Sequence, residues 1–433
     1  MSQLFAKIVA MIGASMILMR RWGADKEVPA IGGAPSIPDA KAQSIPTLKM
    51  PTAKGWQAGH TPTAAPGLSV NIFAADLKHP RWIYVLPNDD VLVAEAIPAP
   101  WAVKSAFDYA ILSTMRRATA VGQSANRITL FRDTTGEGVG HERHVFLSKQ
   151  NQPFGMALVE NTFYVGNTDA LMAFPYESGA NQITGNGQKL ADLKPGGHWT
   201  RSLLVNEAGT KIYIGVGSKT NIADEGMIEE EERAAIHEHD IASGTTRIFA
   251  AGLRNPVGLA WEPNSKTLWT VVNERDGLGD EVPPDYLTSV NDGGFYGWPY
   301  CYWGQTVDDR VPQDPELVAT AIKPDYALGG HTASLGLCWM PAGTLAGFDT
   351  DGMVIGQHGS WNRSNLSGYK VIFVPFADGK PSGAPRDILS GFLSDDEKFS
   401  FGRPVGVTLG PNNSLLVADD VGNVVWRVTS TIR

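Results

Sequence analysis

The sequence predicts an all-β fold, and three observations support that expectation. The 433-residue chain holds 47 glycines and 28 prolines, the residue types that favour turns. It also holds 12 tryptophans, an aromatic type enriched in strands. The third observation is a repeated pattern, in which an apolar alternating run is followed by a turn rich in Pro, Gly or Asn and then by a second apolar run. Each repeat has the pattern of a β-hairpin.

Six copies of this pattern organise the chain. They lie at residues 81–96, 155–168, 202–218, 258–274, 335–359 and 405–419. The intervals between them carry further strand and turn signals, so each copy belongs to a unit of about four strands. Six such units predict a six-bladed β-propeller, in which the blades surround a central channel. A β-sandwich with irregular strand spacing is the alternative architecture.

The first 54 residues are expected to lie outside the propeller, which then occupies residues 55–433. Residues 4–19 form a mostly apolar stretch that Lys7 interrupts, and Arg20 and Arg21 follow it. This stretch is short for a membrane span and lacks a clear cleavage site, so it predicts an export signal or an N-terminal anchor, or else only an irregular chain end. We therefore expect a periplasmic or exported protein that its N-terminus could tether to the membrane. The Pro- and Ala-rich segment that follows suits an extended tether or a strip along the domain surface.

Charge and cysteine content narrow the function. The formal charge of −9 and the isoelectric point near 5.5 exclude a nucleic acid as the main partner, because nucleic-acid binders need a basic face. A small or uncharged ligand fits better. The two cysteines, Cys301 and Cys338, cannot form a disulfide framework, and both a single bridge and two free thiols stay open.

Polar residues stand at corresponding ends of the repeated hairpins. Because paired strands are antiparallel, residues entering the first run and residues leaving the second lie at the same end of a blade. We therefore expect them to ring one mouth of the channel as a binding or catalytic site. The entering residues are Arg81, Gln150, Asn151, His198, Arg254, Asn255, His331, Thr332 and Arg403. The leaving residues are Glu95, Asn167, Ser218, residues 273–276, residues 358–363, Asp419 and Asp420.

Two members of this ring have the chemistry of a catalytic pair. His198 follows two glycines that leave room for a ligand, and its imidazole could accept a proton from a hydroxyl near neutral pH. Arg254 offers a planar, permanently charged fork for a carboxylate or an oxyanion. Asn255 adds hydrogen-bond donors beside it, and Pro256 fixes the turn that presents both residues. The ring is therefore expected to meet an anion.

Two segments are candidates for metal binding. Residues 273–286 are acidic and rich in turns, and they could hold a hard cation through carboxylates and main-chain oxygens, although their spacing is not that of an EF-hand. His237 and His239 fall on one face of a strand that we expect to be an outer, solvated one. A transition-metal site at these two imidazoles is the lesser alternative.

From about residue 56 to the C-terminus, the chain resembles a known family. The motifs are GLRNPVGLAW (252–261), LWTVVNERDGLGDEVPPDYLTSV (268–290), GGFYGWPY (293–300), GQHGSWNRSNLSGYKV (356–371) and GRPVGV (402–407). They resemble the sorbosone dehydrogenase branch of the pyrroloquinoline-quinone-dependent sugar dehydrogenases, which are six-bladed propellers related to soluble glucose dehydrogenase. The resemblance implies two cofactors, pyrroloquinoline quinone and Ca²⁺.

The resemblance also implies roles for individual residues. His198 matches the base that takes the proton of the sugar hydroxyl while a hydride passes to the quinone. Arg254 matches the arginine near the reactive quinone oxygens. The main-chain oxygens of Arg275 and Asp276 correspond to those that hold calcium. The residues that it assigns to the cofactor are Gln150, Asn255, His331, Trp361, Asn362, Arg363 and Arg403.

Two departures from the family pattern stand out. Ser218 occupies the position of an acidic residue beside the catalytic histidine, and the cofactor-binding lysine has no counterpart, with Arg363 as its substitute. The predicted activity is oxidation of an aldose or a sorbosone-like sugar aldehyde, with a quinone or a cytochrome as electron acceptor. A calcium-dependent lactonase and a non-catalytic ligand-binding propeller are the alternatives.

Overall fold

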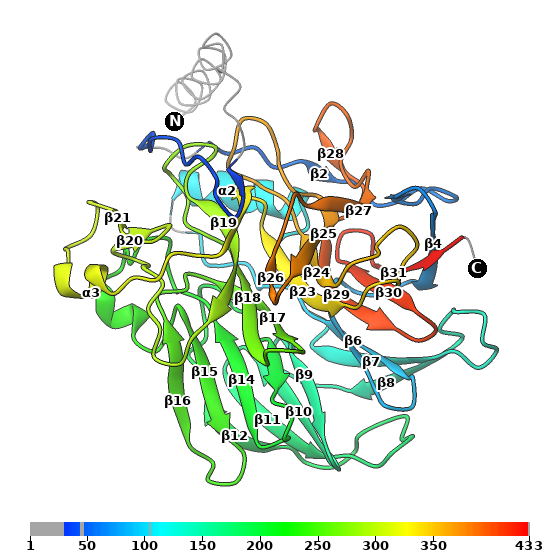
Figure 1. Cartoon of the computed structure of the whole chain (residues 1–433). Coiled ribbons are helices and arrows are strands. Elements are labelled where there is room, and N and C mark those ends of the chain that lie inside the picture. The colour runs from blue at the N-terminus through cyan, green and yellow to red at the C-terminus, as the bar shows by residue number, and fades with distance from the viewer. Residues whose placement is uncertain (1–29, 44–46, 104, 432–433) are drawn as a thin grey trace.

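The structure confirms the six-bladed β-propeller predicted from the sequence (Figure 1). It is a computed structural model that describes residues 30–43, 47–103 and 105–431. Each blade has four antiparallel strands, and the first two strands of every blade coincide with one of the six repeated hairpins. The repeat is therefore the inner half of a blade.

In each blade the strands follow one another from the channel outward. Blade 1 comprises β5 (Pro80–Val85), β6 (Val91–Glu95), β7 (Arg127–Arg132) and β8 (Glu142–Leu147), and blade 2 comprises β9 (Met156–Val159), β10 (Thr162–Asn167), β11 (Ala170–Pro175) and β12 (Gln188–Asp192). Blade 3 comprises β13 (Leu203–Val205), β14 (Lys211–Val216), β15 (Ala235–Asp240) and β16 (Thr246–Ala251). Blade 4 comprises β17 (Pro256–Glu262), β18 (Thr267–Val272), β19 (Pro284–Val290) and β22 (Tyr326–Gly330). Blade 5 comprises β23 (Ser334–Met340), β24 (Gly352–Gln357), β25 (Lys370–Ala377) and β27 (Arg386–Ser390), with β26 (Lys380–Pro381) beside β25.

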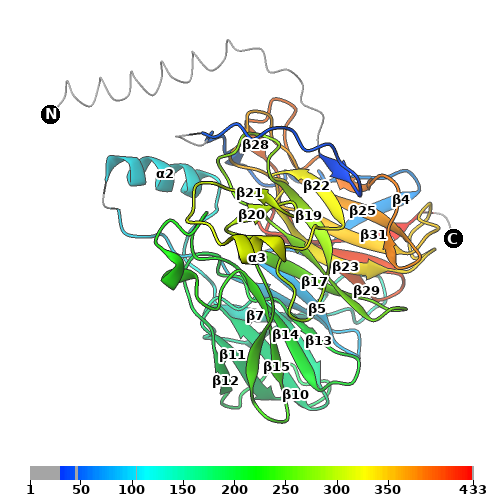
Figure 2. The same cartoon turned by 60° about the vertical axis from the view of Figure 1, so that its left-hand side comes forward.

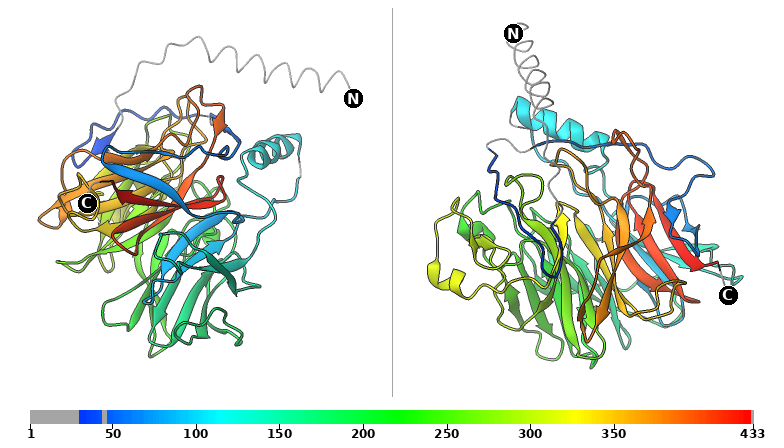
Figure 3. Two further views of the ribbon diagram at one scale, coloured as in Figure 1. Left: turned by 90° about the vertical axis from the view of Figure 1, so that its right-hand side faces the viewer. Right: turned by 45° about the horizontal axis from the view of Figure 1, so that its top comes forward.

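Blade 6 joins the two ends of the propeller. Its inner strands are β29 (Pro404–Gly410), β30 (Ser414–Asp419) and β31 (Val424–Ser430), and its outer strand is β4 (Leu68–Ala74) from the start of the domain. Figure 3 shows this blue strand lying beside the red C-terminal strands. The ring is thus closed by pairing of the first propeller strand with the last.

Neighbouring blades approach each other closely at the innermost strands. A Cβ atom on Gly336 of β23 would lie 2.0 Å from the main-chain oxygen of Val405 in β29. A Cβ atom on Gly258 of β17 would lie 2.5 Å from Leu337 Cβ. Both distances are far shorter than a van der Waals contact, so glycine is required where the backbones of adjacent blades meet. This explains why a glycine recurs in the first run of several repeats.

The N-terminal segment lies along the propeller instead of hanging from it. Strand β1 (Ile31–Gly32) adds to the outer edge of blade 4 through β22, and β2 (Thr52–Ala53) pairs with β28 (Phe399–Ser400). Of the two readings of this segment, the strip along the domain surface is the observed one. The apolar stretch at residues 4–19 lies outside the described residues. No helix in the described ranges is long and apolar enough to cross a membrane.

Three insertions decorate this framework. Helix α2 (Ala106–Arg117) lies between β6 and β7, and Figure 2 shows it beyond the strand ends, at the same side of the propeller as the N-terminal segment. The 3₁₀ helix η1 (Met227–Glu230) lies between β14 and β15. The hairpin β20 (Cys301–Tyr302) and β21 (Thr306–Val307), with α3 (Pro315–Ala319), lies between β19 and β22.

Two local expectations are settled by the structure. Cys301 and Cys338 are free thiols, so the reading as a bridge is wrong. The expectation that His237 and His239 lie on a solvated strand is also wrong, because both side chains on β15 are buried. Their imidazoles lie 2.8 Å from the Glu232 main-chain oxygen and 2.8 Å from Thr246 Oγ1, respectively.

Candidate active site

Polar residues from five blades meet at one mouth of the channel, around a cavity of about 420 Å³. Strand pairing places them there, since Pro256 at the start of β17 lies opposite Val272 at the end of β18. The residues before β17 and after β18 therefore share one end of blade 4. The polar residues of the cavity wall are Arg81, His198, Thr200, Asn255, Asn273, His358 and Arg403.

An apolar roof covers this mouth, which the sequence analysis did not predict. Ile111 and Met115, one turn apart on α2, line the cavity together with Trp101. Leu48 and Met50 of the N-terminal segment complete the roof. The sequence did contain a signal for α2, because Ser105 caps the helix by accepting the Asp108 N–H at 3.0 Å, ahead of apolar residues at helical spacing.

His198 lies at the cavity wall with one ring nitrogen engaged. Its Nδ1–H donates to the Ser218 main-chain oxygen at 2.8 Å, and Ser218 Oγ lies 3.1 Å from the same nitrogen. This bond fixes the tautomer that leaves Nε2 unprotonated, and Nε2 has no hydrogen-bond partner in the described part of the chain. Burial lowers the pKa of His198 to about 3, and the charge of Arg254 adds to the effect. The imidazole is therefore neutral at physiological pH.

Arg254 is buried beside the cavity and is held by oxygens that carry no charge. Its Nη1 donates to the main-chain oxygens of Asn273 at 3.2 Å and Glu274 at 2.8 Å. Its Nε and Nη2 donate to the main-chain oxygen and Oδ1 of Asn221, at 3.2 and 3.0 Å. Burial raises the pKa of Glu274 to about 8, so this nearby carboxyl is largely protonated at pH 7.

Asn221 is a residue that the sequence analysis missed. Besides binding Arg254, it pairs with the peptide of Asp276, accepting its N–H at 2.8 Å and donating to its oxygen at 3.1 Å. Trp298 Nε1 donates to the Asn221 main-chain oxygen at 3.0 Å. Asn221 therefore links the arginine to the segment predicted to bind calcium. It lies on the loop between β14 and β15, just beyond the end of the third repeat, so the repeated pattern did not mark it.

Arg403, before the first strand of blade 6, resembles Arg254 in its bonding. Its Nε and Nη2 donate to the main-chain oxygens of His358 at 2.9 Å and Gly359 at 2.7 Å, and its guanidinium lies over the Tyr369 ring. Within the described ranges, neither Arg254 nor Arg403 forms an ion pair with a carboxylate. The buried positive charge of Arg403 in the cavity wall is thus left for an anionic ligand, with that of Arg254 beside the wall.

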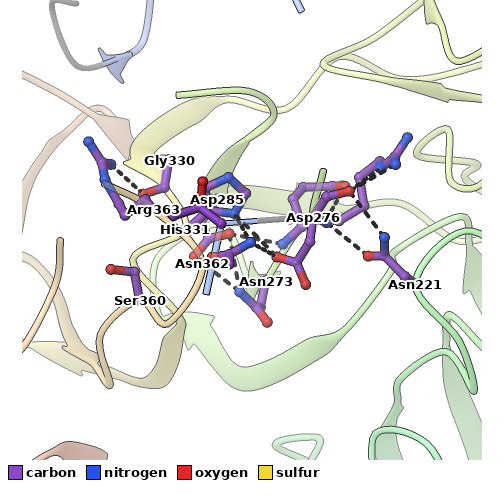
Figure 4. Close-up of polar contacts among 12 residues, drawn as sticks. Asn221, Asn273, Asp276, Asp285, Gly330, His331, Ser360, Asn362 and Arg363 are labelled. Carbon is purple, nitrogen blue, oxygen red and sulfur yellow. Dashed lines mark hydrogen bonds and ion pairs between the residues drawn. The ribbon is translucent and has the colours of Figure 1, made fainter. Parts of the chain in front are cut away.

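A second polar group forms where blades 4 and 5 meet. Figure 4 shows Asp276 between Asn221 on one side and His331 with Asn362 on the other. Asn362 Nδ2 donates to the Asp276 carboxylate, and His331 Nδ1 lies 3.4 Å from it. Burial by itself would raise the pKa of Asp276, but His331 and Arg254 hold it below its ordinary value. The carboxylate is therefore ionised.

Two of the residues assigned from the sequence are engaged elsewhere, and a third, Arg275, is engaged only through its side chain. Gln150 accepts from Asn167 at 3.0 Å and does not line the cavity. Arg363 donates to Glu281 and to the Gly330 main-chain oxygen, on the far side of His331 from Asp276 (Figure 4). The Arg275 guanidinium pairs with Asp308. Of the others, His198, Asn255, Trp361 and Arg403 line the cavity. Arg254 bonds to Asn273 of the cavity wall, and Asp276, His331 and Asn362 belong to the polar group joined to Arg254 through Asn221.

Comparison with curated proteins finds two groups of relatives. An uncharacterised protein of Borreliella burgdorferi is 30% identical over 238 residues, which cover 53% of this chain and 60% of that protein. A pyrroloquinoline quinone-dependent pyranose dehydrogenase of Coprinopsis cinerea is 25% identical over 291 residues, which cover 53% of this chain. The matched part spans only 39% of the length of the Coprinopsis protein.

Comparison with solved structures finds the same propeller. The holo pyranose dehydrogenase domain of Coprinopsis cinerea matches with a TM-score of 0.67 and 20% identity, over 88% of this chain and all of that one. A calcium structure of family AA12 from Trichoderma reesei matches with a TM-score of 0.69 and 18% identity, over the same shares. The aldose sugar dehydrogenase of Streptomyces coelicolor in its quinone-bound form matches with a TM-score of 0.54 and 14% identity, over 85% of this chain and 99% of that one.

These matches agree with the resemblance to quinone-dependent sugar dehydrogenases read from the motifs, while the sorbosone branch stays a prediction. The model of the family described as TrAA12-like matches residues 62–313 and 306–431. Since these two ranges cover all six blades, the protein belongs to the TrAA12-like family.

Proposed function

We propose that this protein oxidises an aldose or a sorbosone-like sugar aldehyde hydrate, with pyrroloquinoline quinone as its cofactor. The observation that carries the proposal is the combination of one imidazole and Arg403 in the cavity wall with Arg254 beside that wall, where neither arginine forms an ion pair with a carboxylate. His198 presents a neutral Nε2, while Arg254 and Arg403 leave positive charge unmatched. A base for a hydroxyl and charge for a polyanionic cofactor are both required by this chemistry.

The residues at the cavity fit the quinone. Pyrroloquinoline quinone is a flat aromatic tricarboxylate, and two buried guanidinium groups without carboxylate partners suit such an anion. Trp199 and Trp361 line the same cavity and supply aromatic surface for a flat ring. A volume of about 420 Å³ lies within the range of small-molecule sites. Arg403 would contact the cofactor from blade 6, and Arg254 would add its positive charge from blade 4.

His198 would act as the general base. When bound, the quinone supplies the acceptor for the hydride of the reacting carbon. His198 Nε2 takes the proton of the hydroxyl, so that the C–H and O–H bonds break and a C=O bond forms. Because its Nδ1 is held by a neutral carbonyl, where the family pattern has an acidic residue, this imidazole is a weaker base than one paired with a carboxylate. It is, in return, deprotonated over a wide pH range.

Calcium is proposed as the second cofactor, and the fit at Arg275 and Asp276 is partial. The Asp276 main-chain oxygen already accepts from Asn221 and from the Arg275 guanidinium, at 3.1 and 2.8 Å, so it does not suit a cation. The Arg275 main-chain oxygen accepts no hydrogen bond from any described residue. That oxygen and the ionised Asp276 carboxylate are the donors we assign to calcium.

Three further features of the proposal come from the sequence and the relatives. The Coprinopsis relative is named as a pyranose dehydrogenase and the Streptomyces structure as an aldose sugar dehydrogenase, which supports a sugar substrate. A membrane quinone or a cytochrome would reoxidise the cofactor. The apolar stretch before Arg20 and Arg21 supports a periplasmic or exported location.

Reconstitution tests the proposal directly. Purified protein is titrated with pyrroloquinoline quinone and Ca²⁺, and the absorbance of the quinone is followed as aldoses and aldehydes are added. We expect saturable binding and bleaching by at least one sugar, with reduction of an artificial dye. Metal-restored lactone hydrolysis without any quinone-dependent dye reduction would replace the dehydrogenase with the lactonase. Sugar binding without either reaction would leave the non-catalytic propeller.

A further inference from the structure

A small lobe of about 130 Å³ lies beside the main cavity, at the junction of blades 1, 5 and 6. The lobe shares Arg81, Trp199, His358 and Arg403 with the main cavity. Asp420 lines the lobe but does not line the main cavity. The lobe is therefore reached through the candidate active site, and Trp199 connects it to His198, its neighbour in the chain.

Asp420 is the centre of the polar network in this lobe. Its Oδ2 accepts from Arg81 Nη1 and from His358 Nε2 at 2.8 Å, and His79 Nε2 lies 3.2 Å from it. The residue is only 1% exposed. The proposed oxidation makes no use of this arrangement, which draws on three blades to surround one carboxylate.

The network carries no net charge. Burial opposes ionisation of Asp420, but His358, His79 and Arg81 hold its pKa well below the ordinary value. Burial lowers the pKa of His79 to about 4 and that of His358 to about 3, so both imidazoles are neutral at pH 7. One carboxylate and one guanidinium therefore cancel. Arg403 also lines the lobe, but it stands on the wall shared with the main cavity and is assigned to the anionic cofactor. The part of the lobe around Asp420 and Arg81 therefore suits a neutral polar ligand better than an anion or an apolar group.

Hydrogen-bonding capacity is left over on both charged partners. Asp420 Oδ1 and Arg81 Nε are buried and have no partner among the described residues. An acceptor and a donor on adjacent side chains match two neighbouring hydroxyl groups, each of which can donate and accept. Trp199 adds an aromatic face that lies under the Arg81 guanidinium, at 5.5 Å. Aromatic rings pack against the C–H faces of sugar rings.

We propose that this lobe binds the hydroxyl groups of a neutral sugar at the end remote from the reacting carbon, with Asp420 accepting, Arg81 donating and Trp199 packing against the ring. The inference rests on the proposed function, and it identifies the hydroxyl groups by which the site would recognise its substrate. Neutral pyranoses bind here, sugar acids bind less well because a carboxylate would face Asp420, and simple alcohols lack the hydroxyl pair.

Binding of a sugar that cannot be oxidised tests the lobe separately from the chemistry. The probe is 1,5-anhydro-D-glucitol, which keeps the pyranose ring and its hydroxyls but lacks the anomeric hydroxyl. Tetrahydropyran-2-methanol is the matched probe without ring hydroxyls. Affinity is measured by calorimetry on the full chain, with and without bound quinone. We expect the first probe to bind and the second to bind at least about tenfold more weakly.

Variants locate the binding. Arg81→Met removes the donors and keeps most of the side-chain length, and it should weaken binding of 1,5-anhydro-D-glucitol about tenfold or more. Trp199→Leu should weaken it too, measured without quinone because Trp199 also lines the quinone cavity. This variant leaves the Asp420 network intact, so it serves as the second test if Arg81→Met fails to fold. Arg247→Met is the control, because Arg247 is also paired with carboxylates but lies on β16, away from the mouth.

Each outcome has a distinct meaning. The proposal that the lobe binds sugar hydroxyls is overturned if the two probes bind equally well. Unchanged binding in folded Arg81→Met and Trp199→Leu proteins overturns it too. Hydroxyl-dependent binding that both variants lose supports it, even if no sugar is oxidised and the proposed function fails. If sugar is oxidised and neither variant changes kcat/KM, the proposed function stands and the sugar-binding role of the lobe is refuted.

Discussion

Replacing His198 is the sharpest test of the mechanism. In His198→Ala the general base is lost, which should reduce kcat by about 10²- to 10⁴-fold. The affinity for pyrroloquinoline quinone should stay nearly unchanged, because Arg254 and Arg403 keep their carbonyl partners. The control is His141→Ala, a partly exposed histidine on the turn between β7 and β8 that should leave kcat unaltered.

The pH dependence of kcat/KM in the wild-type enzyme tests the assignment of His198 independently. With a pKa of about 3, His198 stays deprotonated down to pH 5, so kcat/KM should change by less than about twofold between pH 8 and pH 5 because of this group. An imidazole with the ordinary pKa of 6.5 would be about 97% protonated at pH 5, and kcat/KM would fall about thirtyfold. Initial rates of dye reduction distinguish the two cases.

A substitution at Ser218 should shift the pKa of His198 in the opposite direction, upward. Ser218→Asp places a carboxylate beside Nδ1, which should raise the pKa of His198 and bring an acid-side loss of kcat/KM into the range above pH 5. Ser218→Ala is the matched control, because the main-chain oxygen that accepts from Nδ1 is kept. Turnover in His198→Ala close to that of the wild type, or a thirtyfold acid loss in the wild type, would refute the assignment of His198 as the base.

Four further predictions concern the surroundings of the base. Arg254→Lys keeps the charge but loses the fork that spans several oxygens, so single-turnover reduction of the quinone should slow by more than about tenfold, and an unchanged rate contradicts its role. Asn221→Ala should weaken quinone binding, measured by titration, whereas Asn206→Ala in a surface turn should not. Gly217→Ala should lower the stability to urea by about 1–3 kcal/mol, because the new Cβ would lie 2.2 Å from Asn255 Oδ1, and a midpoint equal to that of the wild type rejects this packing argument. Chelation should abolish sugar oxidation until Ca²⁺ and quinone are added together, with Mg²⁺ a poor substitute; recovery with quinone alone argues against calcium.

The fold could be predicted from the sequence because it repeats. Six alternating hairpins mark the inner strands, and antiparallel pairing then fixes which residues share the mouth. The same rule could have found His79, which precedes Pro80 at the start of β5 just as Asn255 precedes Pro256 and Arg403 precedes Pro404. A residue before proline at the start of an inner strand is thus held at the channel mouth.

The rest of the site depends on loops, which have no repeat. Nothing in the sequence around Asn221 indicates that its amide reaches both Arg254 and the peptide of Asp276. Arg363 is adjacent to Asn362, yet its side chain bonds to Glu281, a residue on a different loop, and not to Asp276. Helix α2 could be recognised as a helix from its cap and its spacing, but its position over the mouth comes from tertiary packing.

The closure of blade 6 has a consequence for how the protein is made. Strand β4 leaves the ribosome first among the propeller strands, but its partner β31 is nearly the last, and Ser69 and Thr429, which bond across this pair, are 360 residues apart in the chain. Throughout synthesis β4 is an unpaired edge that can capture strands of other nascent chains. Because so long a loop must close before the final contacts form, completion of the ring is a slow, late step. A chaperone that shields this edge until the C-terminus emerges would raise the yield of folded protein.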